Sequence, residues 1–561
     1  MISFQKVTLY HERWLEKKSL DFQIYVCGWA EYNGVVLLAK ELLDVIANEY
    51  LQNENEIEKL PYLLNGNFSI IIQSSQNTYL ISDRMRNFPI IYFYQNDTLT
   101  ITDDIFKYRQ ENNTNFKIDE VICEQFLSVN YIVGPYTIFN DVFSTQSGEI
   151  VTINHSEKKI ERNQYFQWKP YMEEDSFTRD YAQEAKLQDS AFMNVFDRMI
   201  KSVPNINNWI IPLSGGYDSR AIVNYLYKLG VKNVICFSYG MESNIQSEIS
   251  RNVAEALGYE WHFVDYKVWI QKMKEQNVID SYLEFGFNGS SVAHLQDFPA
   301  IYALKELGIL NKNDVFVPGH ALEVIAGNHL KMNMKSCTTF ERVMTTLQHH
   351  FSGFGYYTKN KNKVFKHIQN IVSNYNVQPK QVAECFDWQE RQTKFIANSV
   401  KVYEYFGYES RIPEWDEELM KYWDNIGFNY KFERNMFKDV FKKYLTIKEL
   451  MPIPFANDLI IKQKRNFKDI VIENIPFTVK KILKKTGFIK SLYYLNEGSH
   501  LIYSQNKETI ADYLKSYNAP AIVRSYLKPY ATSQKIADFE INSVSTLLLI
   551  RKAIVKNVSK A

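Results

Sequence analysis

From about residue 180 onwards, short apolar segments alternate with longer segments of helical periodicity. The apolar segments, which we expect to be strands, are residues 209–213, 234–238 and 260–264. The periodic segments, which we expect to be helices, are residues 183–199, 218–229 and 246–257. This alternation predicts a parallel, doubly wound sheet. Such sheets bind ligands beyond the carboxyl ends of their strands.

Up to about residue 165 the pattern differs, because aromatic and β-branched runs are separated by polar turns. The runs expected to be strands are residues 21–30, 67–73, 78–82, 90–94, 98–102, 149–154 and 160–168. Asn96 and Asp97 form a hairpin signal, and residues 35–49 predict a helix. After about residue 340 the pattern is helical. We therefore expect an α+β domain with an antiparallel sheet over residues 1–178. An α/β domain with a helical C-terminal part is expected over residues 179–561.

Composition excludes several classes of function. The 561 residues include 65 Lys and Arg and 64 Asp and Glu, so the formal net charge of +1 disfavours a nucleic-acid binder. The five cysteines are scattered without a CxxC pair, which disfavours a disulfide framework or a zinc cluster. Residues 1–20 are too charged for a signal peptide. Apolar runs such as residues 547–550 are far shorter than the ~20 residues of a membrane span. We expect a cytoplasmic protein with no membrane span.

The segment with the clearest chemistry lies between an expected strand and an expected helix. It reads Leu213-Ser214-Gly215-Gly216-Tyr217-Asp218-Ser219. Two glycines allow a tight turn, and the serine hydroxyls and loop N–H groups can face an anion at the helix N-terminus. Asp218 would repel a phosphate directly, but it is suited to hold Mg²⁺ that in turn binds phosphates. The alternative is a Ser or Asp cap on a glycine turn.

This motif resembles the pyrophosphate loop of the N-type ATP pyrophosphatases, which cleave ATP to AMP and pyrophosphate. It differs from a Walker loop because no Lys-Ser/Thr follows the glycines. The resemblance implies an adenine nucleotide α-hydrolase-like fold, with ATP and Mg²⁺ as cofactors. It places Leu213, Ser214, Gly215, Gly216, Asp218 and Ser219 in the ATP and pyrophosphate site.

Further segments resemble the C-terminal domain of asparagine synthetase. Residues 236–240 and 247–258 resemble its second strand and helix, which implies that Ser238 and Tyr239 approach adenine; taken alone they are an ordinary strand and helix. Residues 315–320, with Glu323 and Gly327, resemble a degraded form of the acidic glycine loop of that family. The resemblance places Gly319 in the ATP site and makes Glu323 a second metal ligand beside Asp218. His320 is either a substrate-facing group or a loop residue.

Two more stretches carry the catalytic residues that the resemblance implies. Residues 411–416 resemble the Arg-x-Pro stretch of the family, where Asp416 would orient the catalytic lysine or the incoming amine. The alternative is a helix start after Pro413, and both can hold. Residues 404–409 are a candidate region for a second carboxylate. Residues 462–467 match the lysine stretch of the family, so that Lys464 falls on the catalytic lysine. Lys462 replaces the usual Arg, and a basic run of this kind is otherwise a solvated face.

The N-terminal region resembles the glutaminase domain of the same family through residues 64–68 and 81–92. A glutaminase of this class needs cysteine as its first residue, because the α-amine acts as base for the thiol. This chain begins Met1-Ile2-Ser3, and its first cysteine, Cys27, lies inside a strand pattern. Cleavage before Cys27 would remove a strand. We therefore expect a scaffold without glutaminase activity, similar in this respect to β-lactam synthetase and lasso-peptide cyclases.

Together these features predict an AMP-forming carbon–nitrogen ligase. It would adenylylate a small-molecule carboxylate and transfer ammonia or an amine to it. Similarity of residues 388–392 and 403–407 to synthetase relatives linked to surface-polysaccharide biosynthesis makes a sugar acid one candidate substrate. Two alternatives stay open: a non-catalytic nucleotide-binding relative, and an intramolecular amide-forming cyclase. A homodimer is compatible with the sequence.

Overall fold

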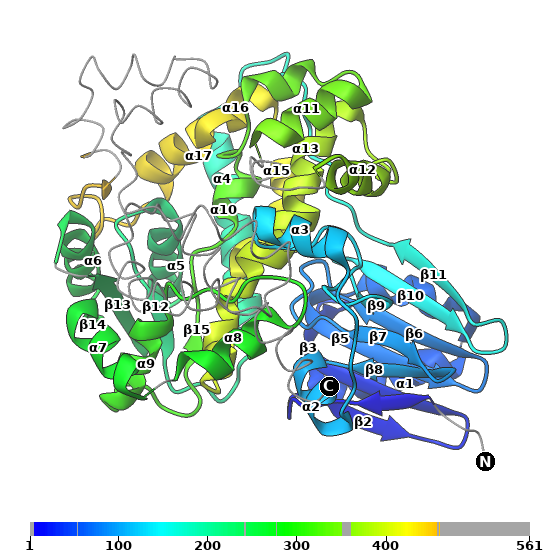
Figure 1. The fold of residues 1–561 in the computed structure, drawn as a ribbon. Coiled ribbons are helices and arrows are strands. Elements are labelled where there is room, and N and C mark those ends of the chain that lie inside the picture. Colours follow the sequence, from blue (N-terminus) through cyan, green and yellow to red (C-terminus); the bar gives the residue numbers. More distant parts are fainter. Residues whose placement is uncertain are drawn as a thin grey trace, which may run out of the picture.

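The computed structural model describes residues 5–52, 54–240, 243–276, 278–350, 361–456 and 459. The N-terminal part contains two sheets (Figure 1). The smaller has the order β1-β8-β7-β9, with β1 (Lys6–Thr8), β7 (Ile91–Gln95), β8 (Thr98–Thr102) and β9 (Val142–Ser144). The larger has the order β11-β10-β6-β5-β3-β2, with β4 paired to β3. Its strands are β2 (Leu15–Lys18), β3 (Phe22–Tyr32), β4 (Val35–Leu38), β5 (Asn65–Ser74), β6 (Asn77–Ser82), β10 (Glu149–Asn154) and β11 (Lys159–Gln164).

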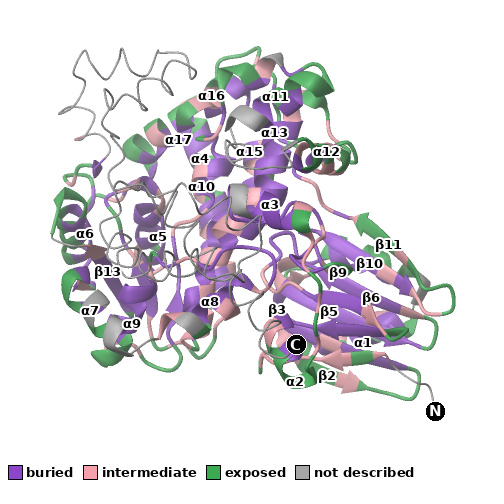
Figure 2. Cartoon of the chain, viewed as in Figure 1, coloured by how far each residue is buried: buried purple, intermediate pink, exposed green. Residues whose placement is uncertain are grey.

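These two sheets form the middle of a four-layer arrangement. Along β5, Ile70 and Ile72 pack with α1 (Ala39–Gln52), whereas Ile71 packs against the smaller sheet. This division follows from the period of two along a strand. On its other face the smaller sheet packs against α2 (Ile105–Asn112) and α3 (Glu120–Val129). Figure 2 shows the central strands of the sheets in purple, as buried, whereas the edge strands β2 and β11 are mostly pink and green.

The antiparallel pattern predicted for this part is confirmed for the larger sheet and for β7, β8 and β9, with two corrections. The first is that β1 pairs with β8 in parallel. Residues 35–49 were expected to be helical throughout, but residues 35–38 form β4, and the helix begins at Ala39. The cause is the turn before them, because Asn33 and Gly34 both have positive φ (50° and 79°). Two such residues make a tight hairpin turn, which returns β4 along β3. Asn96 and Asp97, with φ of 48° and 62°, form the predicted turn of the same kind.

The third sheet is parallel and has the order β14-β13-β12-β15-β16. Its strands are β12 (Trp209–Pro212), β13 (Val234–Gly240), β14 (Glu260–Asp265), β15 (Val315–Phe316) and β16 (Glu409–Ser410). In chain order this is 3-2-1-4-5, the doubly wound topology. The predicted parallel sheet is confirmed, and its topological switch point lies between β12 and β15. Helices α5 (Tyr217–Lys228) and α6 (Ile245–Ala256) connect β12 to β13 and β13 to β14.

Helices make up most of the remaining described chain. Those associated with the parallel sheet are α4 (Tyr181–Lys201), α7 (Tyr266–Gln276), α8 (Ile279–Phe287), α9 (Phe298–Glu306) and α10 (Leu322–Ile325). Those that follow are α11 (Phe340–His350), α12 (Lys361–Val372), α13 (Val382–Phe386), α14 (Lys401–Tyr405), α15 (Glu417–Asp424), α16 (Phe428–Lys431) and α17 (Asn435–Val440). The 3-10 turns are Glu54–Leu63, Met332–Ser336, Pro379–Gln381, Ala397–Val400, Pro413–Trp415 and Phe432–Arg434, and the π-helical turns are Asp387–Ile396 and Phe441–Leu445. Within the described ranges, no helix is long and apolar enough to cross a membrane.

A buried ion-pair group joins the N-terminal sheets to α14. Arg13 Nη2 donates to Glu404 Oε2 (2.8 Å), and Lys401 Nζ donates to the same carboxylate (2.8 and 3.0 Å). Lys401 Nζ also donates to the carbonyl of Asn87 (3.3 Å). Burial acts to raise the pKa of Glu404, but the charges of Arg13 and Lys401 outweigh it and lower the pKa to about 2. Glu404 therefore serves the junction between the two parts.

We expect Glu404→Gln to lower the free energy of unfolding by about 3 kcal/mol at pH 7, because it leaves two buried cations without their shared anion. The pKa of Glu404 is lowered in the folded protein. The stabilisation is therefore complete above about pH 4.5, and it is lost as the pH falls towards 2. Urea unfolding over this pH range measures the difference between variant and wild type. Glu56→Gln, which removes an exposed pair with Lys59, is the control. A difference that stays constant down to pH 2 would contradict the assignment.

Candidate functional site

A cavity of about 360 Å³ opens at the carboxyl ends of β12, β13 and β15. This is the switch point of the parallel sheet, where ligands bind in doubly wound folds. Its lining comes from six parts of the chain: residues within 212–219, Tyr239, residues within 294–297, residues within 318–323, Ser399 and Arg434. The sequence-predicted residues Ser214, Gly216, Asp218, Ser219, Tyr239, Gly319 and Glu323 all line it.

The loop after β12 presents hydroxyl and amide groups to this cavity. Ser214 N donates to Ser219 Oγ (3.0 Å), and the two serine hydroxyls lie 3.0 Å apart. Gly216 is the N-cap of α5 and offers no side-chain cap. The first N–H groups of a helix carry partial positive charge and favour an anion. The loop is therefore a candidate phosphate cradle.

Two glycines around this loop are required by close approach and not by unusual φ angles. A Cβ on Gly215 would lie 2.7 Å from the Cβ of Ala456. A Cβ on Gly319 would lie 2.8 Å from the backbone N of Ser219. The loop backbone is thus packed closely against two other segments of chain. A larger residue at either position would shift it.

Asp218 is paired with a residue that the sequence did not indicate. The carboxylate of Asp218 accepts a hydrogen bond from Arg434 Nη2, and the two form an ion pair. Glu433 and Arg434 both have positive φ (54° and 60°), a left-handed conformation that costs about 1 kcal/mol or more per residue. Such strain persists only where the surroundings hold it, and it is common at functional sites. No motif in the sequence marks Arg434.

Two further carboxyl groups surround this ion pair. Glu323 lines the cavity, with His329 Nε2 3.8 Å from its Oε1. Glu414 is fully buried, and neither of its carboxylate oxygens has a hydrogen-bond partner among the described residues. Burial, together with the negative charges of Asp218 and Glu323, raises the pKa of Glu414 well above its ordinary value, although Arg434 opposes the shift. The group therefore contains three carboxyl groups and one guanidinium.

The residues present are suited to Mg²⁺ bound together with a nucleotide. Within the described part of the chain, no cluster of three or more metal-ligating side chains occurs, so a cage made entirely by protein is not indicated there. Mg²⁺ is usually held by one or two carboxylates plus water and substrate phosphates. Asp218 and Glu323, which line the same cavity, supply carboxylates of that number.

The opposite end of the cavity is built around Asp297. The hydroxyls of Tyr239 (2.5 Å) and Tyr403 (2.8 Å) donate to its two oxygens. The ring of Tyr239 stacks on Tyr266 with centroids 4.9 Å apart. Tyr239 is thereby fixed at the cavity wall. Ser238 is not in the wall, because its hydroxyl lies 2.6 Å from the Leu213 carbonyl and joins the ends of β12 and β13.

Two histidines of the wall are neutral at pH 7. Burial lowers the pKa of both His294 and His320 to about 4. His294 Nε2 donates to the Phe395 carbonyl (2.7 Å). Ser399 Oγ donates to the Ile396 carbonyl (2.7 Å), so it accepts from His320 Nε2 (2.9 Å). His320, left open by the sequence, thus lies in the cavity wall as an uncharged polar group.

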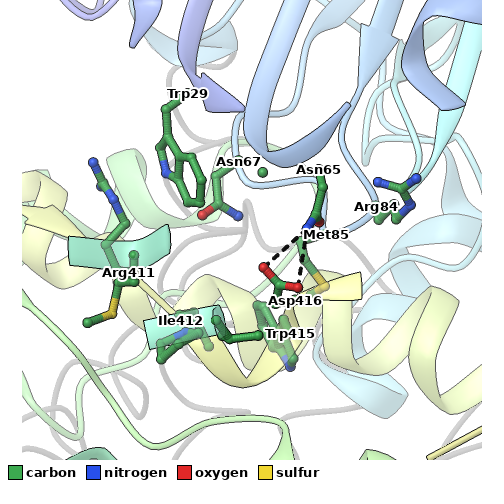
Figure 3. Close-up of a pocket in the computed structure, with 13 residues that line it drawn as sticks. Trp29, Asn65, Asn67, Arg84, Met85, Arg411, Ile412, Trp415 and Asp416 are labelled. Atoms are coloured by element: carbon green, nitrogen blue, oxygen red, sulfur yellow. Dashed lines mark hydrogen bonds between the residues drawn. The ribbon is translucent and has the colours of Figure 1, made fainter. Parts of the chain in front are cut away.

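Asp416 lies in a different place. Its carboxylate accepts from Arg198 Nε (3.0 Å) and Nη2 (2.9 Å), and from Asn65 Nδ2 (3.2 Å to each oxygen). It also caps α15 by accepting from the backbone N of Glu418 (2.9 Å). Figure 3 shows it in a small cavity of about 30 Å³ between the N-terminal sheets and the 411–416 stretch. The helix-start alternative is confirmed, and Asp416 does not line the large cavity.

The region 404–409 likewise places no carboxylate in the cavity. Glu404 belongs to the junction described above, and Glu409 pairs with Arg411 (2.9 Å). The acidic residues that sequence reasoning missed are Asp297 and Glu414. Asp297 lies outside every motif. Glu414 stands within the 411–416 stretch, but only its burial beside Asp218 distinguishes it.

The predicted catalytic lysine, Lys464, lies outside the described residues. The segment that leads towards it is fixed against the phosphate cradle. Ala456 N donates to the Gly215 carbonyl (3.0 Å), and Phe455 stacks on Tyr217 with centroids 4.0 Å apart. Arg220, on α5, donates to the carbonyls of Ile453 (2.8 Å) and Pro454 (2.7 Å). The chain therefore passes over the loop a few residues before Lys464.

Comparisons with known proteins add little to this geometry. No protein-family model and no curated protein sequence matches the chain. The NH3-dependent NAD synthetase from Campylobacter jejuni is 13% identical, with a TM-score of 0.20 over 40% of this chain and 96% of that one. The glutamine phosphoribosylpyrophosphate amidotransferase from B. subtilis is 10% identical, with a TM-score of 0.18 over 60% of this chain and 61% of that one. An allosteric regulatory enzyme of purine biosynthesis is 11% identical, with a TM-score of 0.19 over 60% of each chain. This chain thus spans about three fifths of the length of the last two. Scores of this size carry no functional argument.

We expect Asp416→Asn to destabilise the protein by about 2 kcal/mol, because Arg198 loses one of its three carboxylate partners and keeps Glu31 and Glu418. Binding of a nucleotide in the large cavity should stay within about twofold of wild type, because Asp416 does not line it. Urea unfolding and calorimetry with a non-hydrolysable ATP analogue measure the two quantities. Glu418→Gln, which removes a more exposed partner of Arg198, is the matched control. If Asp416→Asn loses nucleotide binding but keeps its stability, Asp416 must be assigned to the reaction site.

Proposed function

We propose that the chain is an ATP-dependent ligase that forms AMP and pyrophosphate and makes an amide bond. The observation that carries the proposal is the cavity at the switch point, whose wall holds a candidate phosphate cradle and three carboxylates, those of Asp218, Glu323 and Asp297. The absence of a Walker lysine in the cradle favours cleavage between the α- and β-phosphates over γ-phosphoryl transfer.

In the proposed reaction, a substrate carboxylate oxygen bonds to the α-phosphorus and the bond to pyrophosphate breaks. An amine or ammonia nitrogen then bonds to the acyl carbon, AMP leaves, and the nitrogen loses a proton. Ser214, Ser219 and the first N–H groups of α5 would bind the leaving pyrophosphate. Asp218 and Glu323 would hold Mg²⁺, which supplies charge neutralisation to the phosphates.

Lys464 is assigned to the developing negative charge of the transfer step, where a fixed ammonium acts by electrostatic preorganisation. Support comes from the anchored segment before it. Ala456, only eight positions earlier, is hydrogen-bonded to the cradle residue Gly215. Eight residues span at most about 28 Å, and a segment of that length is long enough to bring Lys464 to the cavity. Arg220, Tyr217 and Phe455 form the anchor.

Part of the cavity wall is uncharged and suits the polar groups of a substrate. His294, His320 and Ser399 offer neutral hydrogen-bonding groups there. This favours a carboxylate that also bears hydroxyl or amide groups, a description that includes sugar acids and amino acids. The residues around Asp416 belong to the junction between the two parts of the chain and are not assigned to substrate binding.

Incubation with Mg·ATP, ammonium and a panel of sugar acids and amino acids should release pyrophosphate and AMP. Lys464→Ala should lower turnover by about 10²-fold or more and leave binding of the ATP analogue unchanged. Lys462→Ala, two positions away in the same basic run, is the control. Release of ADP and phosphate would contradict the mechanism, and unchanged turnover of Lys464→Ala would remove that residue from the site. Nucleotide binding without turnover on any carboxylate would favour the non-catalytic alternative.

We also propose that the N-terminal part is a scaffold without glutaminase activity. Cys27 lies in the middle of β3, opposite Ser69 of β5, and is completely buried. Burial raises the pKa of its thiol, which disfavours the thiolate. Its neighbour Gly28 has φ of 91°, and a Cβ there would lie 1.9 Å from the Asn67 carbonyl. The backbone around Cys27 is thus fixed inside the sheet.

Glutamine should therefore yield no glutamate, with or without Mg·ATP. Cys27→Ser should leave ammonia-dependent turnover unchanged, because the thiol is remote from solvent. Enzymatic measurement of glutamate checks both statements. Glutamate that forms in the wild type and disappears in Cys27→Ser would overturn the scaffold assignment.

A further inference from the structure

The ion pair between Arg434 and Asp218 conflicts with metal binding by Asp218. While the guanidinium donates to the carboxylate, that oxygen is engaged by another cation. Both side chains lie in the cavity wall, with exposed fractions of 8% for Arg434 and 15% for Asp218. A divalent cation that binds the same oxygen of Asp218 competes with Arg434 for it. The question is where a displaced guanidinium would go.

The structure offers two destinations for the guanidinium. One is a phosphate group bound at the cradle, because Arg434 and the cradle residues Ser214 and Ser219 line the same cavity. The other is Glu414, a buried carboxyl group without a hydrogen-bond partner among the described residues. A buried polar group without a partner costs free energy, about 1–3 kcal/mol. A state in which Arg434 leaves Asp218 can remove that cost.

The backbone at this point favours a side-chain movement over a loop movement. Glu433 and Arg434 hold two successive left-handed conformations in the turn before α17. Nearby, Gly327 packs against the backbone of Lys431, where a Cβ would lie only 2.4 Å from the carbonyl oxygen. The backbone just before the turn is thus held by packing against Gly327. The Arg434 guanidinium lies over the Phe437 ring, 4.9 Å from its centroid, so a change of partner is a movement of the long side chain across that ring.

We propose that Arg434 is an exchangeable counter-ion of the site. It holds Asp218 while metal is absent, yields that carboxylate to Mg²⁺, and then binds the phosphates of the nucleotide with the buried carboxyl group of Glu414 as its second partner. This inference rests on the proposed function, because it assumes that Mg·ATP enters the cavity. It adds a phosphate-contacting residue that no sequence motif indicates.

The proposal predicts effects of opposite sign from a single substitution. Arg434→Ala removes the competitor for Asp218, so Mg²⁺ alone should bind about threefold or more tightly. The same change removes a cation from the phosphates, so Mg·AMPCPP (the α,β-methylene analogue of ATP) should bind about tenfold or more weakly. A residue with a merely structural role would weaken both.

Isothermal titration calorimetry of the full chain, with Mg²⁺ alone and with Mg·AMPCPP, measures the two affinities. Arg434→Lys should keep the hold on Asp218 and lose part of the phosphate affinity, because an ammonium cannot form a bidentate contact. This variant also serves if Arg434→Ala fails to fold. Glu414→Gln should weaken the binding of Mg·AMPCPP without strengthening the binding of Mg²⁺ alone. Arg251→Ala, on the exposed face of α6, is the control.

The outcomes separate this inference from the proposed function. If the wild-type protein does not bind Mg·AMPCPP, the proposed function fails. If the wild type binds it, but Arg434→Ala weakens the binding of both ligands or of neither, the exchange proposal is overturned and the proposed function stands. Opposite changes in the affinities for the two ligands would establish the exchange. If Glu414→Gln binds Mg·AMPCPP as tightly as the wild type, Glu414 takes no part in the exchange.

Discussion

The functional site depends on how closely the loop after β12 is packed. Its backbone passes between Gly319 on one side and Ala456 on the other, at distances that leave no room for a Cβ at Gly215 or Gly319. This packing places the end of the parallel sheet, the acidic loop after β15 and the segment leading to Lys464 around one helix N-terminus. The partial charge of that terminus then acts in a place from which side chains are excluded. The phosphate cradle is thus a consequence of backbone packing more than of any one side chain.

Charge balance gives the cavity its chemical character. Asp218, Glu323 and Glu414 surround one guanidinium, which leaves an excess of acidic groups near the cradle. An excess of this kind favours uptake of a divalent cation together with a polyanion. Farther along, neutral histidines and a serine make the wall polar without adding charge. One end of the cavity is therefore suited to metal and phosphate, and the other to an uncharged polar substrate group.

The junction between the two parts of the chain is held by ion pairs. Arg198 links Asp416 and Glu418 to Glu31 of the larger antiparallel sheet, and Arg13 links that part to Glu404. Buried pairs of this kind hold a specific geometry because breaking them leaves charges without partners. The N-terminal part is thereby attached rigidly beside the parallel sheet. This is consistent with a scaffold role, since Cys27 is enclosed in the sheet.

The sequence alone determined the local features. Strand and helix periods identified the antiparallel and parallel parts, and the glycine-serine motif located the cradle between β12 and α5. One segment was mistaken, because the turn at Asn33 and Gly34 reverses the chain into β4 before the helix. Only the tertiary structure decided which distant groups meet. It brought Arg434 onto Asp218, buried Glu414 beside them, and placed Asp416 at the junction. The physical reason is that periodicity and turn chemistry act over a few residues, whereas charge pairing and burial depend on contacts between segments hundreds of positions apart.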